Sequence, residues 1–177
     1  MQLLPWNQRT IRFDRSVQEM PLLLERMAGT PARLAHLTRS LPREHLVLSR
    51  EGKWSIMEHI AHLLHLDLRF QARVDDFVAR RSELCRIDLE HHHREVNGHR
   101  DRTLGDLLEE FRLGRSVLVR RIRQMDDSAL GHRAMHPCQH RPMSAVDMAL
   151  WIAEHDDHHL ATVRMIAGPV LDDGAWC

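Results

Sequence analysis

The sequence predicts an all-α protein, a single domain built as a four-helix bundle. Four segments begin with a hydroxyl residue followed three positions later by a carboxylate, the signature of a helix N-terminus. Each of them opens a run of apolar residues with the 3.6-residue helical period. Strand signals are nearly absent, since the 177 residues include no tyrosine and show little alternation of polar and apolar side chains. The four signatures are Ser16–Glu19, Ser55–Glu58, Thr103–Asp106 and Ser144–Asp147.

The first helical stretch should run from about residue 16 to 42, where Pro42 ends it. We expect a break or kink inside it at Gly29-Thr30-Pro31. Thr30 can act as an N-cap there, with Pro31 at the first helical position, where its missing N–H costs nothing.

Three more helices should follow, over about 55–81, 103–126 and 144–167. The last should stop at Gly168-Pro169, because glycine suits a helix C-terminus and proline cannot continue a helix. Four long helices with three connections predict a bundle, so we expect one domain over residues 1–177 with its core at about 15–167. The two longer connections, 82–102 and 127–143, are of a length that is often functional.

Composition restricts the classes of partner. Lys+Arg and Asp+Glu both number 25, so the formal net charge is zero, which disfavours a nucleic-acid binder driven by bulk electrostatics. The three cysteines are widely spaced and form no disulfide framework, as expected in a reducing cytoplasm. We find no signal peptide and no apolar run long enough to span a bilayer. We therefore expect a cytoplasmic protein with neither nucleic acid nor membrane as a partner.

The stretch AEHDDHHLATV at 153–163 carries the clearest chemical signal. His155 and His159 are four residues apart and so lie one turn apart on one helix face, the spacing by which H-E-x-x-H offers two nitrogens to one metal ion. Both fall on the apolar stripe of their helix, where unpaired imidazoles would be costly to bury. A metal ion or a hydrogen-bonded core pair would each satisfy them. His158 projects about 100° away and should lie at the margin.

A catalytic metal usually has three protein ligands, and the helix expected at 55–81 offers candidates for the third. His59, His62 and His65 lie in EHIAHLLHLDLRF. His65 lies further round the helix than the other two. Because that helix is apolar over much of its circumference, helical spacing does not choose between His59 and His62.

Two motifs together resemble the DinB/YfiT-like superfamily of four-helix-bundle proteins. They are GKWSIMEHIAHLLHLD at 52–67 and AEHDDHHLATV at 153–163, and the resemblance extends over roughly residues 15–167. In that family, a histidine eight residues after the tryptophan of the first motif joins the two histidines of the last helix around a divalent metal. Placed on this chain, the pattern starts from Trp54, implies His62 rather than His59, and completes the set with His155 and His159.

The resemblance also implies an activity class. It suggests a divalent metal ion, zinc or nickel first and manganese or iron next, that activates a water or a low-molecular-weight thiol. The protein would then be a metal-dependent hydrolase or a thiol S-transferase acting on a small-molecule substrate, in the form of a homodimer. We slightly favour thiol transfer, because Asp156 stands where H-E-x-x-H has its glutamate. The alternative is a non-enzymatic metal-binding module in a stress response or an interaction.

Other groups deserve simpler interpretations. His91-His92-His93 is more often a solvated run than a metal site, and His136, Cys138 and His140 lack the paired spacing of a structural zinc motif. The arginines of RSVLVRRIRQ at 115–124 should form a solvated helix face. One of the acidic residues around the histidines could orient an imidazole N–H or form a surface ion pair; these residues are Glu154, Asp156 and Asp157.

Overall fold

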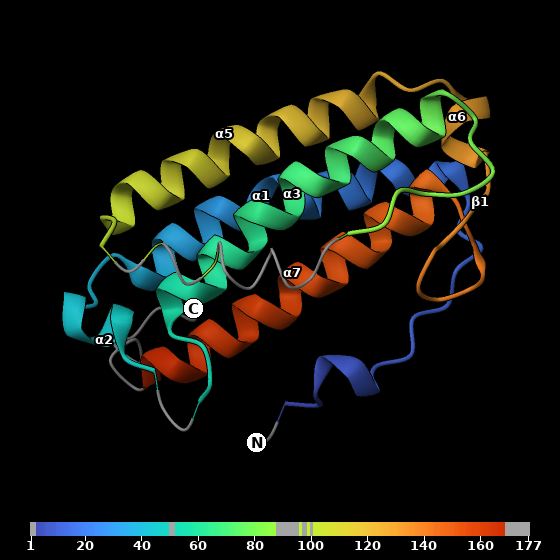
Figure 1. Cartoon of the computed structure of the whole chain (residues 1–177). Coiled ribbons are helices and arrows are strands. Elements are labelled where there is room, and N and C mark those ends of the chain that lie inside the picture. Colours follow the sequence, from blue (N-terminus) through green and yellow to red (C-terminus); the bar gives the residue numbers. More distant parts are fainter. Residues whose placement is uncertain (1–2, 50–51, 88–95, 97–98, 100, 169–177) are drawn as a thin grey trace.

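Four long helices form a bundle in the computed structural model, which describes residues 3–49, 52–87, 96, 99 and 101–168 (Figure 1). The predicted all-α four-helix fold is confirmed, with helix ends close to those expected from the sequence. No helix in the described part of the chain combines the length and the apolar character needed to cross a membrane. The helices are α1 (Met20–Thr38), α3 (Ile56–Val78), α5 (Leu104–Arg123) and α7 (Ala145–Ala167).

The order of the helices around the bundle determines which motifs meet. α1 packs mainly against α7 and α5, and α3 also packs against α5 and α7. The consecutive helices α1 and α3 therefore lie diagonally opposite, and the short helix α2 (Arg43–Val47) lies in the connection between them. This order places α3 beside α7, so the two histidine motifs come together although about ninety residues separate them.

The predicted capping residues start each helix. Ser55 with Glu58, and Ser144 with Asp147, form reciprocal capping boxes at the N-termini of α3 and α7. The Thr103 side chain accepts the Asp106 N–H at the start of α5. The capping box at Ser16 begins a single 3₁₀ turn, η2 (Val17–Glu19), which leads directly into α1.

The expected break at Gly29-Thr30-Pro31 is wrong, because α1 continues through Pro31. Proline has no N–H, so the carbonyl of Met27, four residues earlier, loses its helical donor. Arg115 of α5 donates to this carbonyl instead, over 2.9 Å. The Thr30 hydroxyl does not cap a new helix but donates to Asp156 Oδ2 of α7 at 2.7 Å. Neighbouring helices thus compensate for the proline.

A buried ion-pair network sits at this level and joins all four long helices. The Arg115 side chain is 2% exposed, and its Nε and Nη2 donate to the Asp67 carboxylate at 2.7 and 3.0 Å. It also donates to both oxygens of Asp156, with Nη2 3.1 Å from Oδ1. The Phe111 ring lies 5.0 Å from the guanidinium. The expectation of a solvated arginine face on this helix is therefore wrong for Arg115.

Burial and charge act in opposite directions on this network. Burial raises the pKa of Asp67 to about 6, although the Arg115 guanidinium acts to lower it. Burial acts to lower the pKa of Arg115, but the carboxylates of Asp156 and Asp67 outweigh it and hold that pKa above its usual value. The network separates two apolar clusters of the core, one containing Phe70 and Leu118 and the other containing Leu64 and Leu107.

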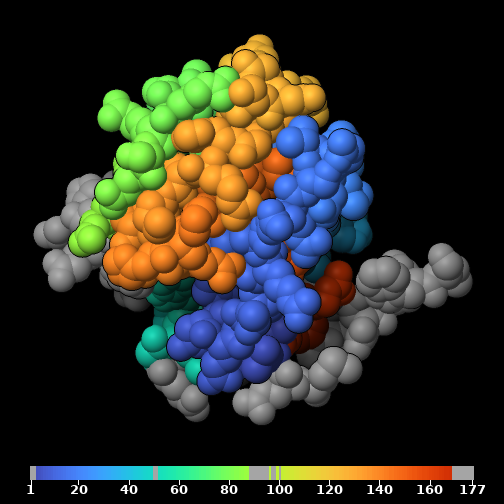
Figure 2. Space-filling view, turned by 90° about the vertical axis from the view of Figure 1, so that its right-hand side faces the viewer, coloured from blue at the N-terminus to red at the C-terminus, as the bar shows by residue number. Residues whose placement is uncertain are grey.

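The N-terminal segment, residues 3–15, lies across the face of the bundle that Figure 2 shows, against the chain that leads into α7. It contains one 3₁₀ turn, η1 (Trp6–Gln8). The N–H groups of Asp14 and Arg15 donate to Asp147 Oδ1 at 2.7 and 2.9 Å, and Arg9 pairs with Glu154. These contacts attach the segment along α7.

The connection 127–143 is more regular than expected. It holds α6 (Asp127–Gly131) and a small antiparallel pair of strands, β1 (Ala134–Met135) and β2 (Pro142–Met143). Glu83 forms a bridge to Met135. Most of the connection 82–102, including His91–His93, lies outside the described residues.

Candidate metal centre

Three histidines from two helices meet inside the bundle. α3 contributes His62, and α7 contributes His155 and His159, whose spacing of four places both on the side facing α3. One ring nitrogen from each lies within 4.8 Å of the others. His155 and His159 are each 5% exposed, and His62 is 9% exposed. They are the only such group of three potential ligands among the described residues.

Two of the three distances between the nitrogens fit a shared ion. His155 Nε2 lies 3.3 Å from His62 Nε2 and 3.1 Å from His159 Nε2. Two imidazole nitrogens bound at about 2.1 Å to one ion lie about 3.0 Å apart in octahedral and about 3.4 Å apart in tetrahedral coordination. A neutral imidazole has one N–H, so His155 Nε2 cannot donate to both neighbours. One cation among the three nitrogens would satisfy all of them.

A fourth histidine supports the group from α3. His59 Nδ1 lies 2.7 Å from Nδ1 of His159, on the opposite side of that ring from Nε2. If His159 donates its Nδ1–H to His59, the Nε2 lone pair of His159 faces the other two ligands, which is the tautomer that metal binding requires. The two candidates that helical spacing left tied, His59 and His62, thus both belong to the site, in different places.

Burial favours the neutral form of two of these imidazoles, those of His59 and His159. It lowers the pKa of His59 to about 4, and nearby His158 adds to this effect while Glu58 opposes it. It also lowers the pKa of His159 well below the usual value, and the neighbouring imidazoles His155 and His62 act in the same direction. A neutral imidazole has a free lone pair, so the protonation state suits a ligand.

Tryptophan rings surround the three histidines. Trp151 stacks on His155 with 4.8 Å between ring centroids, and Trp6 of the N-terminal segment meets the same imidazole edge-on at 4.8 Å. On the α3 side, the Trp54 ring lies 4.6 Å from His62. Sequence reasoning did not find Trp6, because no local pattern connects residue 6 to helix α7. These rings cover the imidazoles and restrict their orientations.

The acidic neighbours of the histidines pair with arginines. Glu154 pairs with Arg9 and Arg26, and Asp157 with Arg26 and Arg33, at the half-exposed surface. Asp156 belongs to the buried network of Arg115. The contact to an imidazole N–H that we expected from a carboxylate is therefore made by His59.

Other histidines of the described chain lie outside the group of three. His65 contacts His99, with 2.6 Å between their Nε2 atoms. His136 is buried and its Nδ1 accepts the N–H groups of Cys138 and Gln139, so it holds its own loop in place. His158 is half-buried beside Trp6, at a centroid distance of 5.8 Å, close to the margin position predicted for it.

The comparison with protein families shows which family the chain belongs to. The model of the DinB superfamily matches residues 26–163. The chain belongs to the DinB superfamily. Among solved structures, this DinB protein is similar to YfiT from Bacillus subtilis, described as a probable metal-dependent hydrolase with an unusual four-helix bundle topology. The TM-score is 0.79 at 15% identity, over 92% of this chain and 93% of YfiT.

A second solved structure with the same fold is a mycothiol-dependent maleylpyruvate isomerase. It matches with a TM-score of 0.68 at 12% identity, over 81% of this DinB chain and 60% of the isomerase. The chain therefore spans little more than half of that enzyme. No curated protein matches the sequence. At these identities the two structures establish the fold alone.

The hydrogen bond between His59 and His159 leads to a prediction. His59→Ala should weaken zinc or nickel binding by about 10–100-fold, because loss of a partner that orients a ligand has this effect. His59→Gln, which can still hydrogen-bond to His159, should recover part of the affinity. Metal titration of tag-free protein measures both variants.

His65→Ala is the matched control, since it removes another hydrogen-bonded histidine of α3. It should leave metal affinity unchanged. Equal losses for His59→Ala and His65→Ala would show a general effect on α3 and remove the orienting role. Thermal unfolding of the metal-free variants checks that each is folded.

Proposed function

We propose that this DinB protein is a metal-dependent enzyme in which His62, His155 and His159 hold a divalent cation. The observation that carries the proposal is the convergence of the three Nε2 atoms, with separations of 3.3 and 3.1 Å around His155. The description of YfiT as a probable metal-dependent hydrolase supports the same class. A set of three imidazoles suits zinc, nickel and other first-row divalent ions.

The protein's own residues prepare the site. A bound divalent ion would lower the pKa of a water or thiol ligand, so that a nucleophile is available near neutral pH. His59 holds the His159 ring in the required orientation. The rings of Trp6, Trp54 and Trp151 cover the imidazoles and reduce the access of bulk water, which strengthens electrostatic interactions inside.

The position of Asp156 favours thiol chemistry over hydrolysis. Asp156 directly follows His155, where a metalloprotease of the H-E-x-x-H type has its general base. Here its carboxylate is 1% exposed and pairs with Arg115, so it is not placed to take a proton from water. A thiol loses its proton much more readily than water and needs no such base. We therefore place a thiol-dependent S-transferase or isomerase first, and a hydrolase second.

The name of the second structural neighbour supports this preference, since that protein is a mycothiol-dependent isomerase. A low-molecular-weight thiol is accordingly our candidate for a second cofactor. The substrate class would be a small electrophile that accepts a thiolate. A non-enzymatic metal-binding module is the remaining alternative, because the same three histidines could bind a metal without catalysing a reaction.

One experiment distinguishes these functions. Tag-free protein is stripped of metal, reloaded with zinc or nickel, and assayed with glutathione, cysteine and mycothiol against aryl halides and maleyl compounds, and separately with nitrophenyl esters and anilides. We expect metal-dependent thiol transfer or isomerisation. Metal-dependent ester or amide cleavage without thiol transfer would instead establish the hydrolase. Stoichiometric metal binding with no turnover in either panel would contradict an enzymatic role.

A further inference from the structure

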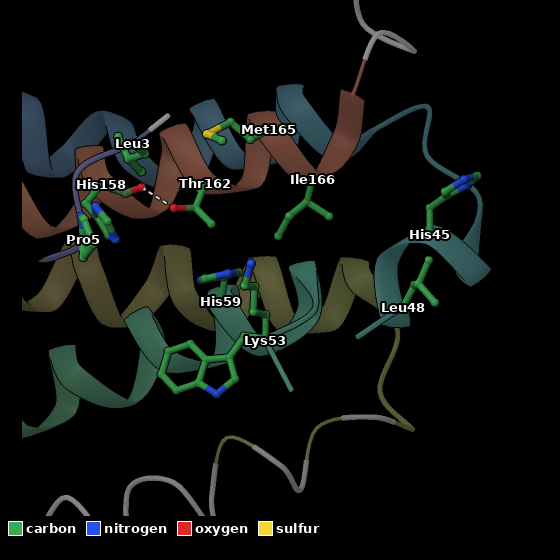
Figure 3. Close-up of a pocket in the computed structure, with 11 residues that line it drawn as sticks. Leu3, Pro5, His45, Leu48, Lys53, His59, His158, Thr162, Met165 and Ile166 are labelled. Carbon is green, nitrogen blue, oxygen red and sulfur yellow. Dashed lines mark hydrogen bonds between the residues drawn. The ribbon is translucent and has the colours of Figure 1, made fainter. Parts of the chain in front are cut away.

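The N-terminal segment borders two cavities. The larger measures about 570 Å³ and adjoins the candidate metal centre, and Figure 3 shows Leu3 and Pro5 beside His158 at one end of it. The smaller, which we call the N-terminal cleft, measures about 390 Å³ and is lined by residues from 6–13, from 139–141 and from α7. Sites for small organic molecules typically measure about 300–1,000 Å³. The N-terminal cleft is therefore large enough for a small ligand.

Arg141 provides the N-terminal cleft with a cation. Its Nη2 donates to the Ile11 carbonyl at 2.8 Å, which joins the chain before α7 to the N-terminal segment, and these two parts lie side by side in Figure 2. The guanidinium carbon lies 3.9 Å from the centroid of the Phe13 ring. No carboxylate of the described residues forms an ion pair with Arg141. These contacts hold the guanidinium in place and leave its charge unpaired.

Arg9 also lines the N-terminal cleft, but its charge is matched. Its Nη1 and Nη2 donate to the carbonyl and the carboxylate of Glu154, at 3.2 and 3.3 Å. None of the described residues that line the cleft is acidic. With Arg9 paired, the charge that remains in the wall is that of Arg141. A wall with one unmatched positive charge favours a ligand with an anionic group.

Two tryptophans form the aromatic part of the wall. Trp6 and Trp151 both line the N-terminal cleft and are half-buried, and their rings meet edge-on with 5.3 Å between centroids. Both rings also contact His155, which restricts their orientation. Aromatic rings add about 0.5–1.5 kcal/mol per pair beyond the burial of their surface. A flat aromatic group on the ligand would therefore suit this part of the wall.

We propose that the N-terminal cleft binds a small aromatic carboxylate. The carboxylate accepts hydrogen bonds from the Arg141 guanidinium, whose planar fork matches the two oxygens, and the ring of the ligand packs against Trp6 and Trp151. The site is separate from the three histidines of the candidate metal centre. It rests neither on a bound metal nor on the proposed function.

Benzoate and benzamide test the proposal, because they share a ring and differ in charge. The chain has four tryptophans, and nitrogen-15 NMR of the tag-free full chain follows each indole N–H during titration. Single Trp→Phe variants assign the signals. We expect benzoate to shift the signals of Trp6 and Trp151 and to bind more tightly than benzamide. A benzoate titration that shifts the Trp54 signal alone would place the ligand elsewhere and overturn the proposal.

Substitutions of Arg141 test the charge preference. Arg141→Gln should weaken benzoate binding about fivefold, as expected for one partly exposed ionic contact, and leave benzamide binding unchanged. Arg141→Lys retains the charge without the planar fork and should keep part of the preference for benzoate. Arg133→Gln is the matched control, since it removes a nearby arginine that pairs with Asp14 and does not line the cleft. This variant should bind both ligands as the wild type does.

Three results would overturn the proposal. The first is equal affinity of the wild type for benzoate and benzamide, and the second is unchanged benzoate binding in Arg141→Gln. If Arg141→Gln loses both ligands because the N-terminal segment has detached, Arg141→Lys decides, and the third result is the absence of a preference for benzoate in that variant. His62→Ala, which removes a proposed metal ligand, should bind benzoate as the wild type does. This result would support the cleft even if the protein binds no metal, whereas lost binding would contradict a site separate from the metal centre.

Discussion

Replacing Arg115 with methionine should destabilise the folded protein by about 3–5 kcal/mol at pH 7, the usual cost of removing one partner from a buried ion pair. The substitution leaves the carboxylates of Asp67 and Asp156, each 1% exposed, without their cation. It also leaves the Met27 carbonyl without the donor that compensates for Pro31. Urea unfolding, followed by circular dichroism, measures the loss.

The loss should shrink as the pH falls through the folded-state pKa of Asp67 in the variant, which lies above that of the wild type because Arg115 no longer lowers it. Burial raises the folded-state pKa of Asp67 to about 6, above the value of roughly 3.9 for an unfolded chain. Asp67 therefore binds a proton more readily in the folded state than in the unfolded state. Above its folded-state pKa the unpaired carboxylate is charged and destabilises the folded variant; below that pKa it is protonated and this cost is relieved. Arg112→Gln on the same helix breaks only an exposed pair with Glu109 and should change stability by less than about 1 kcal/mol. Similar losses in the two variants would contradict the structural importance of the network.

Replacing His155 with alanine should lower the affinity for zinc or nickel more than about 100-fold, beyond the effect expected for an orienting partner. His155 Nε2 faces the Nε2 atoms of both His62 and His159, so its loss removes the central one of the three proposed ligands. His62→Ala and His159→Ala should have comparable effects. Competition with a chromophoric chelator measures affinities in this range.

His158→Ala is the control for these variants, since it removes an imidazole from the same turn of α7 that lies outside the group of three. Its metal affinity should equal that of the wild type. A loss in His158→Ala as large as that in His155→Ala would mean that the ion lies elsewhere on α7, and the ligand assignment would be wrong.

Much of the fold could be predicted because helix starts are local signals. Ser55 with Glu58 and Ser144 with Asp147 cap α3 and α7 where the sequence indicates. The convergence of His155 and His159 also follows from helix geometry alone. The continuity of α1 could not be predicted in this way, because the groups that compensate for Pro31 belong to a distant part of the chain.

The third proposed metal ligand could not be chosen from the local sequence pattern. The first half of α3 is buried around nearly its whole circumference, so periodicity does not distinguish His59 from His62. The family resemblance pointed to His62, and the structure gives His59 a separate place behind His159. The roles of Arg115 and Trp6 were not found from sequence, since each depends on contacts between segments far apart in the chain.

The most direct test of the metal centre is a crystal structure of tag-free protein loaded with zinc or nickel, with anomalous data collected at the metal edge. We predict one ion per chain, about 2.0–2.1 Å from the Nε2 atoms of His62, His155 and His159, with His59 still hydrogen-bonded to His159. Two results would contradict this ligand assignment. One is an ion bound instead at His65 and His99 or at His136 and Cys138, and the other is the absence of any ion from the bundle interior.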